Sequence, residues 1–259
     1  MNQTTRRKYL IDYLLNESRE YKGMAVPSDE TSQRQFLRGL MNVRMPGEIG
    51  ADFLEVQNEY LKEELAEKGI VTLEEIQFSD ESIGIWKGDI TRLAVDAIVN
   101  AANSGMTGCY VPNHTCIDNC IHTFAGVQLR CECGRIMRIQ GYEEPTGKAK
   151  LTPGYNLPAK HVLHTVGPIV QGRVTRHDEE LLASCYTSCL DLAAENGLES
   201  VAFCCISTGV FHFPNQRAAE IAVQTVREYL KKDSSVKKVI FNVFKDMDEQ
   251  IYRELLEQH

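Results

Sequence analysis

The spacing of hydrophobic residues differs between the first seventy residues and the rest of the chain. Up to about residue 70, apolar side chains recur every three or four positions, as in Tyr60, Leu61 and Leu65, and Gly69 follows soon after. This periodicity is typical of amphipathic helices, and a glycine just past such a run is a common helix end. We expect three helices here, packed as an extension on the rest of the chain.

Beyond residue 80, short β-branched or aromatic runs alternate with helical stretches. The expected strands are 83–86, 97–100, 161–166, 201–206 and 239–244, and the expected helices are 117–137, 178–197, 215–232 and 246–258. Such alternation predicts a sheet covered on both faces by helices, with ligands bound beyond the carboxyl ends of the strands. We therefore divide the chain into a helical N-terminal extension, residues 1–70, and an α/β domain, residues 71–259.

Composition narrows the classes of protein to which the chain can belong. A formal net charge of −8 argues against a protein that coats nucleic acid, because such binding depends on neutralising phosphates. No apolar run approaches about twenty residues and no signal-peptide pattern is present, so we expect a cytoplasmic protein without a membrane span. In that compartment the nine cysteines stay reduced and can serve as core residues, metal ligands or nucleophiles.

Two polar loops follow the first two expected strands. In the first loop, Asp89 stands next to Ile90 and could accept a hydrogen bond from an exocyclic amine such as that of adenine; it could equally cap a turn. In the second loop, Asn100 and Asn103 flank two alanines, so a ligand could approach closely and bind both amides through a sugar hydroxyl. The same asparagines could simply end the strand.

The next loop, residues 108–116, carries the most informative chemistry in the sequence. It holds two thiols and an imidazole, from Cys109, His114 and Cys116. Zinc accepts thiolate and imidazole ligands, and three protein ligands leave a fourth position for water or substrate. We therefore expect one zinc ion per chain, although a closed four-ligand site or no metal at all are alternatives. The candidates for a fourth ligand are Asp118, Cys120 and His122.

The last polar loop, residues 207–214, precedes an expected helix. Small residues with free N–H groups next to a helix N-terminus suit a diphosphate, and Phe211 or Phe213 could pack against a ribose or adenine. No Gly-Lys-Ser/Thr follows, so this is not a Walker loop. By contrast, Cys131 and Cys133 lie in an expected helix and His164 on an expected strand, and we interpret all three as structural residues.

Five segments stand along the chain in a distinctive order: GDIT, VDAIVNAAN, CIDNCIHTFAG, HVLHTVGP and CISTGVFHFP. Together they resemble the macrodomain family, over residues 83–245. The Cys/His loop stands where MacroD-type members have a glycine run, and this is similar to the zinc-dependent macrodomains of bacteria. The resemblance implies a three-layer α/β/α fold with a central mixed sheet and a helical N-terminal extension.

The resemblance also implies roles for individual residues. Asp89 and Ile90 would bind adenine, and Asn100 and Asn103 would face the distal ribose. Asp118 falls on the catalytic aspartate, with Asn103 as its neighbour in the catalytic centre. The zinc ligands would be Cys109, His114 and Cys116. The residues around the diphosphate would be Ser207, Thr208, Gly209, Val210 and Phe211.

The function implied by the resemblance is removal of mono-ADP-ribose from protein side chains, with ester-linked Asp or Glu favoured. Zinc could activate a water or orient a ribose hydroxyl, and Asp118 could act as general base. The implied partners are ADP-ribosylated proteins, including a lipoylated carrier protein modified by a sirtuin-type ADP-ribosyltransferase. Alternatives are a reader that binds ADP-ribose without cleaving it, a deacetylase of O-acetyl-ADP-ribose, and a cysteine hydrolase with a Cys–His pair.

Overall fold

The computed structural model describes residues 1–257. Its helices are α1 (Gln3–Glu17), α2 (Glu30–Val43), α3 (Ala51–Lys68), α4 (Ile117–Ala125), α5 (Val127–Gln140), α6 (Arg176–Glu195), α7 (Asn215–Leu230) and α8 (Asp246–Glu257), with short 3-10 helices η1 (Leu73–Glu75) and η2 (Ile90–Arg92). Its strands are β1 (Gln77–Phe78), β2 (Ile83–Lys87), β3 (Ala97–Ala102), β4 (Ala149–Pro153), β5 (His161–Val166), β6 (Ser200–Phe203) and β7 (Lys238–Val243). Among the described residues, no helix has the length and apolarity that crossing a membrane requires.

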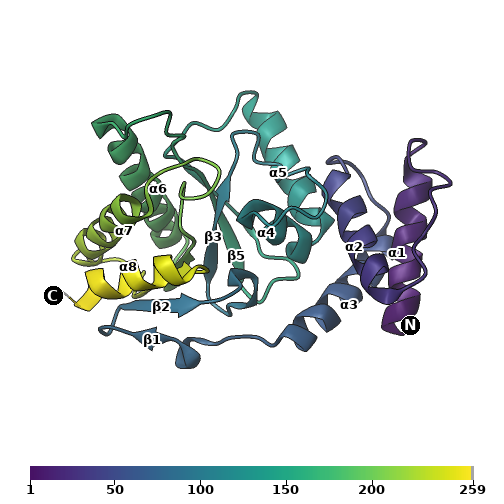
Figure 1. Cartoon of the computed structure of the whole chain (residues 1–259), viewed down its shortest axis with the longest axis horizontal. Helices are drawn as coiled ribbons and strands as arrows, with labels where there is room; N and C mark the ends of the chain where they lie inside the picture. Colours follow the sequence, from purple (N-terminus) through teal and green to yellow (C-terminus); the bar gives the residue numbers. More distant parts are fainter. Residues whose placement is uncertain (258–259) are drawn as a thin grey trace.

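The strands form one sheet of seven in the order β1-β2-β7-β6-β3-β5-β4. The five inner strands run parallel, and the edge strands β1 and β4 pair antiparallel with β2 and β5. Helices α4 and α5 lie on one side of the strands, and α6, α7 and α8 lie on the other (Figure 1). Strand β6 is buried along its whole length, as expected where helices cover both faces. The expected three-layer α/β/α fold with a mixed sheet is confirmed.

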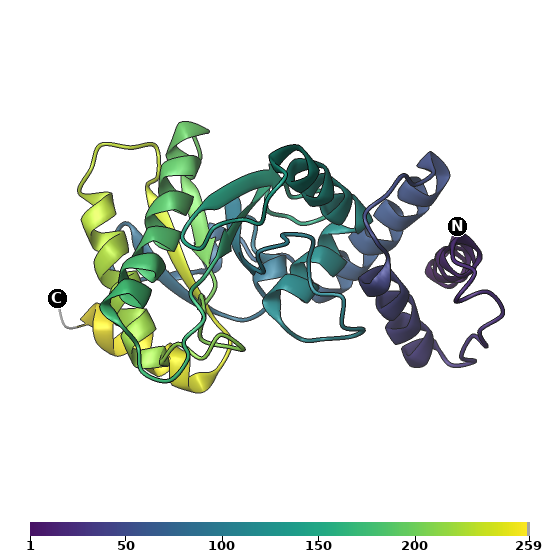
Figure 2. The ribbon, with the colours of Figure 1, turned by 90° about the horizontal axis from the view of Figure 1, so that it is seen from above.

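The three N-terminal helices gather beside α4 and α5 (Figure 1 and Figure 2). Leu10, Leu37 and Phe53 are almost completely buried in a hydrophobic cluster that is separate from the core around the sheet. Val127 of α5 joins this cluster and so ties it to the α/β domain. Gly69 follows the end of α3 as the sequence pattern predicts.

Three details of the expected secondary structure need correction. The expected helix 117–137 is two helices that meet at Gly126, where φ is +96° and a Cβ would lie 2.6 Å from Nε2 of Gln57. The expected strand 201–206 ends at Phe203. The edge strands β1 and β4 escaped the sequence pattern because they are largely exposed or half-buried and carry no apolar run. Residue 258 of the expected last helix lies outside the described residues.

Candidate functional site

The predicted site residues lie in loops at the carboxyl ends of parallel strands. Asp89 follows β2, Asn103 follows β3, and the loop 204–214 follows β6. Strands β2, β7, β6 and β3 are neighbours that all run in the same direction. Loops that follow parallel strands of one sheet emerge at the same edge, which is where ligands bind in open α/β sheets. The structure therefore places these loops along a single edge.

Asp118 lies in the first turn of α4, where two asparagine side chains from the end of β3 hold it. Nδ2 of Asn100 donates to its Oδ1 at 2.8 Å, and Nδ2 of Asn103 donates to its Oδ2 at 3.2 Å. Asn100 is fully buried and Asp118 nearly so, whereas Asn103 is exposed. Burial raises the pKa of Asp118 to about 6, against the opposing effects of the two amides and of Arg130. The arrangement fixes the orientation of one buried carboxyl group.

The loop 108–116 brings Cys109, His114 and Cys116 together. Sγ of Cys109 lies 3.6 Å from Nδ1 of His114, and the three potential ligand atoms all lie within 4.8 Å of one another. Zinc bonds of about 2.3 Å to sulfur and about 2.05 Å to nitrogen, at the tetrahedral angle, would separate a sulfur and a nitrogen ligand by about 3.6 Å. The donor set and its spacing therefore fit a zinc ion.

Two local features shape this loop. Gly108 has a φ of +85°, and a Cβ there would lie 2.8 Å from the ring of His122, so only glycine lets the chain pass this close to α4. Cys116 is the N-cap of α4, and its Sγ accepts a hydrogen bond from the backbone N–H of Asn119 at 3.4 Å. Burial raises the pKa of the Cys116 thiol to about 12, so the thiolate needs a cation beside it.

None of the three candidates for a fourth ligand joins this group. Sγ of Cys120 accepts a hydrogen bond from Arg38 at 3.6 Å, and Asp118 is held by the two asparagines. His122 belongs to a second, fully buried group. Among residues 1–257, the group of candidate metal ligands in the loop thus has three members. Three protein ligands would leave one coordination position of zinc for water or substrate.

Asp89 serves as the cap of η2. Its Oδ1 accepts hydrogen bonds from the N–H and the hydroxyl of Thr91, at 3.0 and 2.6 Å, while its Oδ2 lies 3.6 Å from Nζ of Lys68 at the end of α3. The turn-capping alternative is therefore realised, and Oδ2 is the oxygen that remains for a ligand amine. Ile90 is 1% exposed and packs in the hydrophobic core beneath this loop.

Phe244 is a candidate that the sequence interpretation missed. It follows β7 directly, and its side chain is 76% exposed. The N–H of Gly88 donates to the carbonyl of Val243 at 3.0 Å, so Phe244 stands beside the loop that carries Asp89. An exposed aromatic ring at this edge can stack on a nucleobase. The sequence interpretation counted Phe244 as the last residue of an expected strand, which concealed it.

The loop 204–214 presents backbone N–H groups at the same edge. Ser207 has a φ of +65°, and its carbonyl accepts a hydrogen bond from the N–H of Phe213 at 3.0 Å, which closes the loop. The N–H groups of residues 208–211 donate to no other described residue, and α7 begins without a side-chain cap. Free N–H groups just ahead of a helix N-terminus suit an anion such as a diphosphate.

Comparison with known proteins identifies the family. The family model of the Macro domain matches residues 99–222. A protein-ADP-ribose hydrolase of Treponema medium is 57% identical over 99% of this chain and 100% of its own length. The chain belongs to the macrodomain family. A protein-ADP-ribose hydrolase of Staphylococcus aureus (strain Mu50 / ATCC 700699) is 49% identical to this macrodomain, over 97% of this chain and 95% of that protein.

A solved structure supports the same assignment at the level of the fold. The Trypanosoma brucei macrodomain in complex with ADP-ribose is 29% identical to this chain and has a TM-score of 0.66, covering 89% of this macrodomain and 97% of that chain. The family model begins at residue 99, whereas the match to the Treponema medium protein extends over nearly the whole chain. The likeness to that relative therefore includes the helical extension.

Proposed function

We propose that this macrodomain is a zinc-dependent hydrolase that removes mono-ADP-ribose from modified protein side chains. Two relatives that match almost the full chain carry the name protein-ADP-ribose hydrolase. The observation that carries the proposal is the position of Asp118. This buried carboxyl group is fixed by Asn100 and Asn103 and stands two residues after Cys116. It lies where the metal loop, residues 108–116, meets the end of β3.

ADP-ribose would lie along the edge of the sheet. Its adenine would stack on Phe244 and donate its amine to Oδ2 of Asp89, with the backbone N–H of Ile90 close by. The free N–H groups of residues 208–211 would bind the diphosphate. The distal ribose would then reach Asn103, the exposed member of the asparagine pair, with Asn100 acting through Asp118.

In the proposed reaction, water adds to the anomeric carbon of the distal ribose while the bond to the side-chain oxygen breaks. Asp118 accepts the proton of the water at a carboxylate oxygen and passes it to solvent, and the protein side chain leaves as a carboxylate. Zinc, when bound by Cys109, His114 and Cys116, supplies positive charge that polarises the water or a ribose hydroxyl. Asp and Glu esters are favoured because a carboxylate leaves far more readily than the alkoxide of Ser.

The natural substrate that the family resemblance suggests is a lipoylated carrier protein modified by a sirtuin-type ADP-ribosyltransferase. A cysteine hydrolase is less well supported, because that chemistry needs a group to orient the histidine. Nδ1 of His114 contacts Cys109, but within residues 1–257 no hydrogen bond reaches Nε2 of His114.

The test is a comparison of binding with release. The zinc-loaded full chain should bind ADP-ribose by calorimetry and release it from an Asp- or Glu-modified protein, and release should stop when a chelator removes the zinc. A Ser-modified protein should be a poorer substrate. Binding without any release would identify a reader, and release only from O-acetyl-ADP-ribose would identify a deacetylase. Release that survives complete removal of zinc would contradict the metal requirement.

A further inference from the structure

Helix α2 of the extension lies against the metal loop and against α4, which carries Asp118. Figure 1 shows α2 on the side of the extension that faces α4. Two polar side chains of this helix, Arg38 and Asn42, are four positions apart and therefore project from the same face. Both side chains make hydrogen bonds to residues of the loop 108–116.

Arg38 fixes the backbone at a metal ligand. Its Nη2 donates to the carbonyl oxygen of His114 at 2.7 Å and to Oδ1 of Asn119 at 2.9 Å. Nδ2 of Asn119 in turn donates to the carbonyl of Val111 at 3.0 Å. One guanidinium thus holds His114 directly and the preceding part of the loop through Asn119.

Asn42 holds the residue next to the same ligand, which has a left-handed backbone conformation. Its Oδ1 accepts the backbone N–H of Asn113 at 2.9 Å, and its Nδ2 donates to Oγ1 of Thr123 at 2.9 Å. Asn113 has a φ of +57°, a left-handed conformation that asparagine adopts more readily than other residues apart from glycine. Because Asn113 directly precedes His114, Asn42 controls the direction in which the chain enters the ligand.

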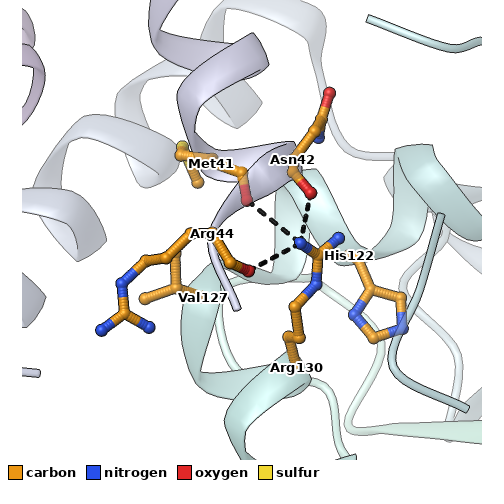
Figure 3. Close-up of a pocket in the computed structure, with 6 residues that line it drawn as sticks. All are labelled: Met41, Asn42, Arg44, His122, Val127 and Arg130. Carbon is orange, nitrogen blue, oxygen red and sulfur yellow. Dashed lines mark hydrogen bonds between the residues drawn. The ribbon is translucent and has the colours of Figure 1, made fainter. Parts of the chain in front are cut away.

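Arg130 joins the end of α2 to the first ligand. Figure 3 shows its guanidinium among the backbone carbonyls of Met41, Asn42 and Arg44, to all of which it donates. Its other nitrogen, Nη2, donates to the carbonyl of Cys109 at 3.2 Å. Carbonyls at the end of a helix lack hydrogen-bond donors within the helix, and the buried guanidinium of Arg130 supplies those donors. The end of α2 and the start of the metal loop are therefore fastened to the same side chain.

We propose that α2 is part of the metal centre, with Arg38 and Asn42 as positioning residues that hold His114 in its ligand orientation. The inference rests on the proposed zinc function of the loop. Neither side chain reaches the ligand atoms, so both act through the backbone of residues 113 and 114. Groups that orient metal ligands from behind typically change metal affinity by about 10–100-fold when they are removed.

The experiment measures the zinc dissociation constant of the full chain by competition with a chromophoric chelator. Asn42→Ala should weaken zinc binding by roughly 10–100-fold, and the spectrum of the Co²⁺-substituted protein should change with the ligand geometry. The matched control is Gln57→Ala in α3. Gln57 is also a fully buried amide of the extension, and its Oε1 accepts the N–H of Val127 at 3.0 Å, away from the loop. This control should lower the melting temperature and leave zinc affinity unchanged.

Should Asn42→Ala fail to fold, Arg38→Gln tests the same inference at the half-buried Arg38, because it removes the Nη2 that donates to the carbonyl of His114. Zinc affinity that is unchanged in Asn42→Ala or Arg38→Gln would overturn the inference while leaving the zinc hydrolase intact. An equal loss of affinity in Gln57→Ala would also overturn it, since general destabilisation would then be the cause. A wild-type chain that binds no zinc would overturn the proposed metal function as well.

Discussion

The macrodomain holds two groups of three His and Cys side chains that could bind a metal, and Asp118 is close to both. The loop group is Cys109, His114 and Cys116, and the core group is His122, Cys133 and His164. The loop group is half-buried and the core group is fully buried. Asp118 stands two residues after the first group, and its Oδ1 lies 3.5 Å from Nε2 of His122 in the second. The residue types and the proximity to Asp118 alone therefore do not show which of the two groups binds a metal.

The hydrogen bonds distinguish one histidine of each group, His164 of the core group and His114 of the loop group. Nδ2 of Asn100 lies 3.1 Å from Nδ1 of His164, and because an amide nitrogen can only donate, Nδ1 accepts. Nε2 of His164 then carries the proton and donates to Oγ1 of Thr152 at 2.9 Å. Both nitrogens of His164 are engaged, so a metal ion could bind to this histidine only by breaking one of these bonds, whereas the ring nitrogens of His122 have no hydrogen-bond partner among the described residues. Burial also lowers the pKa of His164 to about 3, which keeps it neutral.

In the loop group the histidine is not engaged by residues outside the group. Within residues 1–257, the one side-chain partner of Nδ1 of His114 is Sγ of Cys109, a member of the same group, and no hydrogen bond reaches its Nε2. The comparison teaches that His114 keeps its ring nitrogens free of partners outside its group, while His164 does not, and that the loop is held in place by bonds to its backbone. The following experiments test that distinction.

The largest expected effect is the difference between one cysteine from each group. Cys116→Ala should lose zinc and lower de-ADP-ribosylation by roughly a hundredfold or more, because the activating metal is gone. Cys133→Ala should keep about one zinc per chain and lose only packing, at a cost of about 1 kcal/mol. Metal analysis of both purified variants, followed by a turnover assay, makes the measurement. Zinc retained in Cys116→Ala but lost in Cys133→Ala would reverse the assignment of the two groups.

The next effect concerns Asp118. Asp118→Ala should slow de-ADP-ribosylation by roughly a hundredfold, the usual scale for a removed general base. It should keep its zinc and most of its affinity for ADP-ribose, because adenine and diphosphate are bound by other loops. Calorimetry alongside single-turnover kinetics separates the two properties. A loss of affinity as large as the loss of turnover would mean that Asp118 only shapes the pocket.

A smaller effect is expected at Asp89, which belongs to neither group. Asp89→Ala should weaken ADP-ribose binding by about 1–3 kcal/mol, because it leaves the adenine amine unpaired. The loss of binding free energy should lie toward the lower limit of this range, because Oδ2 of Asp89 is shared with Nζ of Lys68, which lies 3.6 Å away. Calorimetry on the folded variant gives the difference, and zinc content should stay at the wild-type value. Unchanged affinity would remove Asp89 from the site.

The two groups also show what the sequence could and could not predict. The loop group was predictable because its three residues are close in sequence, and the helix-covered sheet was predictable from its buried β-branched strands. The core group was not, because its residues come from α4, α5 and β5 and meet only after folding. The contact between Asn42 and Asn113 spans 71 positions and leaves no local pattern. Gly126 looked like an interior helix residue because its packing against Gln57 of the extension is likewise non-local.

The smallest expected effect probes the core group at Thr152. Thr152→Val keeps the shape of the side chain but removes the oxygen that accepts Nε2–H of His164. An unpaired buried donor costs about 1–3 kcal/mol, and the lower limit applies here because Sγ of Cys133, 3.9 Å from the same nitrogen, can accept the proton weakly. Denaturant unfolding should therefore show a loss of about 1 kcal/mol, with zinc content and turnover unchanged. A variant that bound a second zinc would show that the Thr152 hydroxyl keeps metal out of the core group. A variant that lost its single zinc would show that the core group is the metal site.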